Sequence, residues 1–134
     1  MKKEGSSPKT GRAILGAFLA ALCMKFFLFD FMIAEGQSMM PAIMPGTVLL
    51  VNKLRYGFRL PWSGVYSLWW SQPKQGDVLV FYTPMGEIAV KRCAEITEKN
   101  EFIALGDNSP QSYDSRSYGP VSMDRIIGKV LGIK

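Results

Sequence analysis

Hydrophobic residues are distributed along the chain in two ways, as one long run near the N-terminus and as several short runs after it. The long run covers residues 13–34, and its only charged members are Lys25 and Asp30. As a helix it would reach roughly 33 Å, enough to cross the hydrocarbon core of a bilayer. Both charges lie in its outer half, where a lysine stem can reach the interface and an aspartate can meet water. The run therefore predicts a transmembrane anchor over 13–34.

Two other interpretations of this segment are weaker. A basic start followed by apolar residues is also typical of a cleaved secretory signal. However, no pair of alanines in the spacing of a cleavage site follows the run, and Leu22 stands before Cys23, where a lipoprotein site has a small residue. A buried helix of a soluble protein is disfavoured because the segment has no polar face. The sequence favours an anchor that is retained.

The short runs alternate or cluster branched side chains and are separated by Gly and Pro, which is typical of strands and turns. Five such strands with irregular connections predict a mainly β protein, in which one transmembrane helix precedes a small antiparallel β domain over 35–134. The predicted strands cover residues 47–54, 78–82, 88–96, 102–105 and 126–133.

Three connections between these strands have distinct compositions. Residues 35–46 contain two prolines and two glycines and predict an apolar loop, whereas residues 106–116 predict a long polar loop. Residues 55–75 are rich in aromatic side chains, which would either fill the core or rest in a lipid interface. Both interpretations stay open for the aromatic residues, which are Tyr56, Phe58, Trp62, Tyr66, Trp69 and Trp70.

The formal charge of +5 is concentrated at the N-terminus. Four basic residues against Glu4 fall within residues 1–12, and the region from Glu35 onward has nearly balanced charges. A nucleic-acid surface is therefore not indicated. The basic residues instead predict a cytoplasmic tail over 1–12, with the β domain on the outer side of the membrane.

The composition limits the chemistry, because the chain contains no histidine. A serine nucleophile here cannot use an imidazole base, and a lysine is the remaining candidate. Burial would have to lower the pKa of that lysine from about 10.4 to roughly 7 or 8. Strand alternation over 88–96 places Lys91 on one face with Ala89 and Cys93. With two separated cysteines that we expect not to pair, Cys23 and Cys93, and no histidine, no zinc site, other metal or cofactor is expected.

Several motifs then resemble the bacterial type I signal peptidase (leader peptidase) family, in a short form. Each is weak alone, but they follow an anchor in the family's order and cover roughly residues 13–131. They are Gln37-Ser38-Met39-Met40-Pro41, Gly76-Asp77-Val78, Val90-Lys91-Arg92, Gly106-Asp107-Asn108 and Ser112-Tyr113-Asp114-Ser115-Arg116.

The resemblance implies a role for each matching residue. Ser38 matches the family's nucleophile, Lys91 its general base, and Ser112 the serine that orients the base. The residues that match the polar side chains bracing the loop are Asp107, Asp114 and Arg116. Some members have a serine two residues before the nucleophile that helps to stabilise the oxyanion. Here that position is Gly36, so the backbone N–H of Ser38 is the expected oxyanion donor.

The implied function is that of a serine endopeptidase of the cytoplasmic membrane that removes signal peptides from secreted preproteins with small residues before the cut. Its partners would be those preproteins and membrane lipid, without nucleic acid. Two alternatives stay open: a peptidase with the same Ser/Lys dyad dedicated to one client, such as a pilin or conjugation protein, and a non-catalytic membrane-tethered β module that binds through Trp62, Trp69 and Trp70. A self-cleaving repressor would need a helix-turn-helix, which the sequence lacks.

Overall fold

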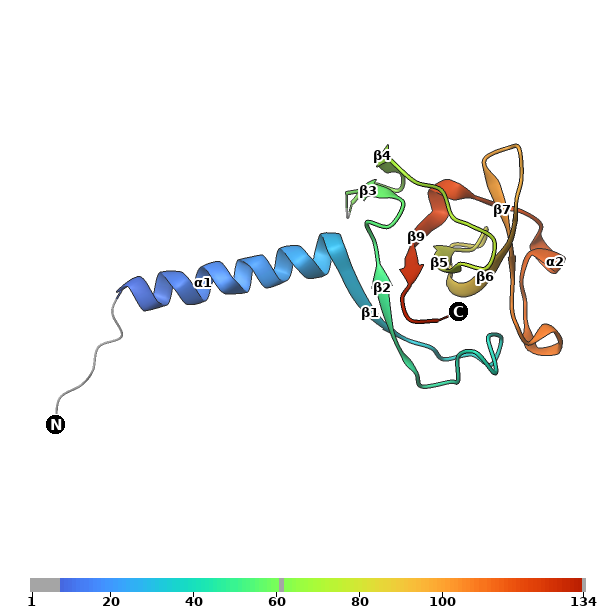
Figure 1. Ribbon diagram of the computed structural model, residues 1–134, viewed down its shortest axis with the longest axis horizontal. Coiled ribbons are helices and arrows are strands. Elements are labelled where there is room, and N and C mark those ends of the chain that lie inside the picture. Colours follow the sequence, from blue (N-terminus) through green and yellow to red (C-terminus); the bar gives the residue numbers. More distant parts are fainter. Residues whose placement is uncertain (1–7, 61, 134) are drawn as a thin grey trace.

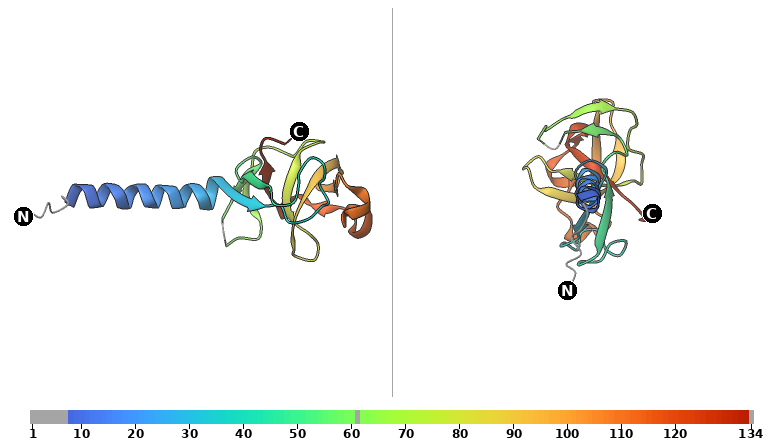
Figure 2. Two further views of the ribbon diagram at one scale, coloured as in Figure 1. Left: turned by 90° about the horizontal axis from the view of Figure 1, so that it is seen from below. Right: turned by 90° about the vertical axis from the view of Figure 1, so that its left-hand side faces the viewer.

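An apolar helix projects away from a β domain in the computed structural model, which describes residues 8–60 and 62–133 (Figure 1, Figure 2). The α-helix α1 runs over Pro8–Cys23 and continues as a π-helical turn, Met24–Leu28. Together they form a 21-residue helix whose length and apolar composition are sufficient to cross a membrane. None of the residues in its most apolar stretch is buried. Within the predicted tail over 1–12, residues 1–7 lie outside the described residues and the rest belong to α1.

The predicted helix over 13–34 is wrong at both ends. It begins five residues earlier, at Pro8, and ends at Leu28, because strand β1 occupies Phe29–Ile33. This strand pairs antiparallel with β2 (Val48–Asn52), with Phe29 opposite Asn52 and Ile33 opposite Val48. Aromatic and branched side chains suit a strand as well as an apolar helix, so hydrophobicity alone could not locate the change. Asp30 forms an ion pair with Lys53 at 3.1 Å instead of lying in a helix.

The rest of the chain forms an antiparallel β domain, which confirms the predicted fold class. A seven-stranded sheet has the order β1-β2-β9-β5-β6-β7-β8, and β3 pairs with β4 in a separate two-stranded sheet. The further strands are β3 (Gly57–Arg59), β4 (Tyr66–Trp69), β5 (Val78–Tyr82), β6 (Ile88–Ile96), β7 (Glu101–Leu105), β8 (Val121–Ser122) and β9 (Ile126–Val130). Short helical segments cover Ser109–Gln111, α2 (Ser115–Tyr118) and Met123–Arg125.

Two hydrophobic clusters form the core, and β5 contributes to both. Leu79 and Phe81 pack in the first cluster with Tyr56, Tyr66 and Phe102. The second contains Val78 and Val80 together with Leu49, Val51, Val130, Met39 and Ile43. Since Met39 and Ile43 belong to the loop that carries Ser38, burial of their side chains anchors that loop on the sheet.

The aromatic segment over 55–75 divides between the core and the surface of the domain, and contact of its exposed members with lipid stays a prediction. Tyr56 and Tyr66 are buried in the first cluster. The three tryptophans are exposed, with Trp62 the most exposed at 79%. The cysteines Cys23 and Cys93 are both free, as predicted.

Candidate active site

The loop that carries Ser38 is held at its base and along its length. Ala34 N–H donates to Thr47 O at 2.9 Å, and Gly46 N–H donates to Ala34 O at 2.6 Å. Inside the loop, Ile43 N–H donates to Met39 O at 2.8 Å. Because Met39 is buried and Ser38 only partly so, the serine hydroxyl is presented at the surface of the domain.

Lys91 lies in the middle of β6, which is flanked by β5 and β7 in the sheet. It is paired with Leu79 of β5, and only 6% of the residue is exposed. Its Nζ atom lies 2.6 Å from Ser38 Oγ, in a hydrogen bond between residues 53 positions apart. The structure therefore brings together the two residues that the sequence singled out as nucleophile and base.

The environment of Lys91 disfavours the ammonium form. Burial lowers the pKa of its amine below the ordinary lysine value, and the nearby charge of Arg116 also lowers it, whereas Asp114 acts in the opposite direction. Among residues 8–60 and 62–133, no carboxylate lies within ion-pair distance of Lys91. An amine of lowered pKa beside a hydroxyl can accept the hydroxyl proton.

Asp114 is the centre of the polar loop over 106–116. Its carboxylate is fully buried and accepts hydrogen bonds from Gly106 N–H at 2.8 Å, Ser112 Oγ at 2.5 Å, and Arg116 Nε at 2.9 Å. Burial alone would raise the pKa of Asp114, but the bonds from Arg116, Gly106 and Ser112 outweigh it and hold the pKa well below its usual range. The Asp114 carboxylate thus joins Gly106, Ser112 and Arg116 within the polar loop.

Ser112 lies beside the serine loop, and its hydrogen bond in the described structure goes to Asp114. Residue 106 lies so close to Ser112 and to the Ser38 carbonyl oxygen that glycine is required there. A Cβ atom there would lie 2.1 Å from Ser112 Oγ and 2.6 Å from Ser38 O. The orienting contact from Ser112 to Lys91 stays a prediction.

Three further residues position the site: Arg92, Gly106 and Asn108. They belong to motifs quoted from the sequence, but no role was predicted for any of them. Arg92 donates to both carboxylate oxygens of Asp107, at 2.8 Å and 2.7 Å, and so fastens the polar loop to β6. Asn108 donates from its backbone to Ser38 O at 2.9 Å and from Nδ2 to Gln37 O at 3.0 Å. The Gly106-Asp107-Asn108 motif could be recognised in the sequence, but the residues that its members contact could not be predicted from it.

A cavity of about 570 Å³ opens onto Ser38 and Lys91. Its apolar lining comes from the serine loop, the end of β1 and the start of β6, and residues with polar groups, such as Gln111 and Tyr113, also line it. Met32 and Ile33, which the sequence placed in the anchor, are part of this lining. The apolar lining residues are Met32, Ile33, Ala34, Met39, Ile43, Ile88, Ala89 and Val90.

The backbone near Ser38 leaves a donor available. Within the described residues, no acceptor takes a hydrogen bond from the N–H of Ser38. At Gly36, a Cβ atom would meet no heavy atom within 4 Å, so a side chain could be accommodated there.

The fold and this geometry define a class of protein: a small antiparallel β domain behind an apolar helix, with a loop serine hydrogen-bonded to a buried strand lysine. The family model described as "Signal peptidase, peptidase S26" matches residues 8–96 and 92–133. The chain therefore belongs to the signal peptidase S26 family.

Individual relatives agree with this assignment. The chain is similar to the signal peptidase I of Bacillus caldolyticus, with 25% identity across 80% of each chain. It is 34% identical to the signal peptidase I of Pseudomonas aeruginosa over 63% of this chain and 30% of the relative. A third signal peptidase I, from Buchnera aphidicola, is 42% identical over 36% of this chain and 16% of the relative. The chain thus spans less than a third of two of these relatives and most of the other.

Proposed function

We propose that this protein is a membrane-anchored serine endopeptidase that removes signal peptides from secreted preproteins with a Ser38/Lys91 dyad. The observation that carries the proposal is the 2.6 Å contact between the Ser38 hydroxyl and the amine of Lys91, a residue that is only 6% exposed. The similarity to signal peptidase I of Bacillus caldolyticus and Pseudomonas aeruginosa supports the same reaction class.

The reaction follows from this contact. The Ser38 oxygen attacks the carbonyl carbon of the scissile peptide, while its proton passes to the uncharged Lys91 amine. The resulting ammonium returns the proton to the leaving nitrogen, which departs as an amine and leaves an ester on Ser38. A water molecule then gives a proton to Lys91 and attacks the ester. Collapse of that intermediate returns the proton to the Ser38 oxygen and releases the new carboxyl end.

The surrounding residues have supporting roles in this proposal. The free N–H of Ser38 donates to the developing oxyanion, and loss of such a donor typically costs about 100- to 1,000-fold in rate. Ser112 orients the Lys91 amine, while Asp107, Asp114 and Arg116 hold the polar loop in place through the contacts described above.

The cavity determines which peptides can react. Its apolar lining from β1 and β6 suits small side chains of an extended segment, and Ser38 and Lys91 line the same cavity. We therefore expect substrates with small residues at the first and third positions before the cut. A substrate held by its own signal helix in the same membrane would meet this cavity at a lower entropic cost.

The placement in the membrane follows from charge. Residues Pro8–Leu28 cross the cytoplasmic membrane once, and this span replaces the anchor over 13–34 that the sequence predicted. The basic residues at the N-terminal end of the span are Lys2, Lys3, Lys9 and Arg12, and they keep the N-terminus in the cytoplasm, so the β domain lies on the outer side.

Alanine substitutions of the dyad test the proposal. Ser38→Ala and Lys91→Ala should each lower preprotein cleavage in detergent by at least about 1,000-fold. Ser67→Ala and Lys74→Ala are matched controls, because both residues are exposed. Circular dichroism should show an unchanged fold in all four variants. Turnover retained in either dyad variant would exclude the proposed mechanism.

A second measurement separates an enzyme from a binding module. An acylating serine-protease probe should label Ser38 in the wild type and not in Lys91→Ala, as mapped by mass spectrometry. An unlabelled, folded wild type would favour a non-catalytic module. Cleavage of many members of a preprotein panel would indicate a general signal peptidase, and cleavage of one would indicate a dedicated enzyme.

A further inference from the structure

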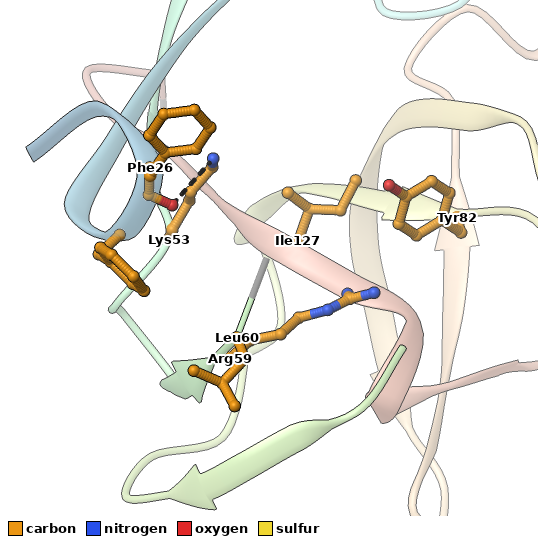
Figure 3. Close-up of a pocket in the computed structure, with 7 residues that line it drawn as sticks. Phe26, Lys53, Arg59, Leu60, Tyr82 and Ile127 are labelled. Carbon is orange, nitrogen blue, oxygen red and sulfur yellow. Dashed lines mark hydrogen bonds between the residues drawn. The ribbon is translucent and has the colours of Figure 1, made fainter. Parts of the chain in front are cut away.

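A second cavity, of about 140 Å³, lies where the apolar helix meets the β domain (Figure 3). It shares no lining residue with the cavity at Ser38. Aromatic rings from the end of the helix and cationic side chains from the β domain face the same space. The residues that define its chemistry are Phe26, Phe27, Lys53, Arg59, Tyr82 and Ile127.

Arg59 brings a positive charge to this cavity. Its Nε donates to Ser63 O at 3.1 Å, and its Nη1 donates to Ile126 O at 3.3 Å. The guanidinium lies over the ring of Tyr82, 5.5 Å from the ring centre, and Figure 3 shows it extending in that direction. Among residues 8–60 and 62–133, no carboxylate lies within ion-pair distance of it. Backbone acceptors fix the guanidinium in place without neutralising it.

Lys53 is held differently. Its Nζ forms the ion pair with Asp30 at 3.1 Å and lies 3.5 Å from Phe26 O, the contact drawn in Figure 3. Its charge is therefore compensated, and it ties the last helical turn to the domain. The cavity as a whole carries one net positive charge, from Arg59.

The position of Phe26 and Phe27 along the helix indicates how deep in the membrane this cavity lies. A helix of 21 residues is about 31 Å long, close to the hydrocarbon thickness of a bilayer. Phe26 and Phe27 lie in its final turn. With the helix spanning the membrane, the cavity falls just beyond the hydrocarbon, in the interfacial layer that contains lipid phosphates.

We propose that this cavity binds the phosphate of an anionic glycerophospholipid, an inference that rests on the proposed membrane anchoring. The phosphate oxygens accept hydrogen bonds from Arg59, as bidentate anion recognition by a guanidinium favours. The acyl chains run along Phe26 and Phe27 into the hydrocarbon. A headgroup amine would place a second cation beside Arg59, so lipids without one bind more tightly.

Native mass spectrometry of the full chain in detergent tests this site. The wild type should retain phosphatidylglycerol more strongly than phosphatidylethanolamine, and inorganic phosphate at equal concentration should not displace the lipid. Arg59→Gln should weaken phosphatidylglycerol binding about fivefold, the change expected for one charge near an anionic lipid. Arg55→Gln removes the same charge from an exposed neighbour that does not line the cavity and should leave binding unchanged.

A second variant guards against loss of folding in Arg59→Gln. Leu60→Trp narrows the cavity while keeping both cations, and it should also weaken retention of the lipid. Equal binding by the wild type, Arg59→Gln and Leu60→Trp would overturn the inference, as would displacement of the lipid by inorganic phosphate.

Flotation with vesicles separates this result from failure of the anchoring. The wild type and both variants should float with vesicles of phosphatidylcholine alone, because the helix provides the attachment. Proteins that float without a preference for phosphatidylglycerol would contradict the lipid site only. A wild type that does not float would contradict the proposed anchoring and, with it, the lipid site.

Discussion

Two lysines lie opposite the same leucine in the sheet, one on each neighbouring strand, but their side chains contact different groups. Leu79 of β5 is opposite Lys91 of β6 on one side and Lys129 of β9 on the other. Lys129 forms an ion pair with Asp77 at 2.6 Å, and its side chain is 25% exposed. Lys91 is 6% exposed and meets the hydroxyl of Ser38 instead of a carboxylate.

This difference shows that the partner and the access to water determine what a lysine can do. An ammonium beside a carboxylate keeps its proton and serves the structure. An amine that is buried without an acidic partner is easier to deprotonate, so it can take a proton from its neighbour. In the proposed mechanism the loop that carries Ser38 supplies the hydroxyl partner, while the sheet presents both lysines in the same row.

Substitution of each lysine by arginine should show the largest difference between the role of Lys91 and that of Lys129. Lys91→Arg should lower kcat/KM for a preprotein about 1,000-fold, because a guanidinium does not lose its proton and cannot act as a base. Lys129→Arg keeps a cation for Asp77 and should stay within about twofold of the wild type. Equal losses in the two variants would mean that Lys91 has only a structural role.

The position of Ser38 against Lys91 can be disturbed without changing either residue. Gly106→Ala should lower kcat about 100-fold, the typical result of moving a reacting group by about 1 Å, since the new Cβ would press on Ser112 and Ser38 O. Gly64→Ala is the matched control, because a Cβ there meets nothing within 4 Å. Steady-state kinetics and circular dichroism would be measured for both. Full activity in Gly106→Ala would show that the polar loop does not position the nucleophile.

The pH dependence should follow Lys91 and not Lys129. Activity requires the neutral amine, so log kcat/KM should rise by about one unit per pH unit until the pH passes the pKa of Lys91. Burial lowers that pKa below the ordinary lysine value, so the rise should level off below pH 10.5. Lys129→Gln should leave the midpoint unchanged. A rise that continues to pH 10.5 would contradict a depressed pKa at Lys91.

Stability should change in opposite directions when each lysine becomes methionine. Because the folded-state pKa of Lys91 is lowered, the unfolded chain binds the proton more tightly, and the wild type gains stability as pH rises toward the unfolded value. Lys91→Met removes this cost and should raise the free energy of unfolding at neutral pH by about 1 kcal/mol. The gain should shrink as the pH approaches the ordinary lysine value.

Lys129→Met should instead lower the free energy of unfolding by about 1 kcal/mol, because it leaves the Asp77 carboxylate without its ion-pair partner. Thermal denaturation of the β domain in detergent would measure both variants. A loss of stability in Lys91→Met at neutral pH would show that the Lys91 contact stabilises the native state.

Sequence patterns predicted the central strands best. The predicted ranges 78–82 and 88–96 coincide with β5 and β6, because runs of branched side chains bounded by turns favour strands wherever they fold. The strands that were not predicted are β1, β3, β4 and β8. β1 continues the hydrophobicity of the helix, β8 has two residues, and β3 and β4 lie in the aromatic segment around Pro61 and Gly64.

Candidate residues for the site could be named from the sequence, but the contacts between them could not. Ser38 and Lys91 could be named because the chain lacks histidine and carries the family's motifs. The hydrogen bonds from Asn108 to Ser38 and Gln37 join residues about 70 positions apart, and no local pattern encodes them. The same holds for the pairing of Arg92 with Asp107.

The sequence by itself determined the kinds of groups available: an apolar helix, strands rich in branched residues, and a serine and a lysine without an imidazole. The tertiary structure decided where the helix ends, which of two lysines opposite Leu79 meets a hydroxyl, and how closely Gly106 lets the polar loop approach Ser38. The physical reason is that residue types and their spacing are local properties. Burial and contact distance instead depend on which distant segments the folded sheet brings together.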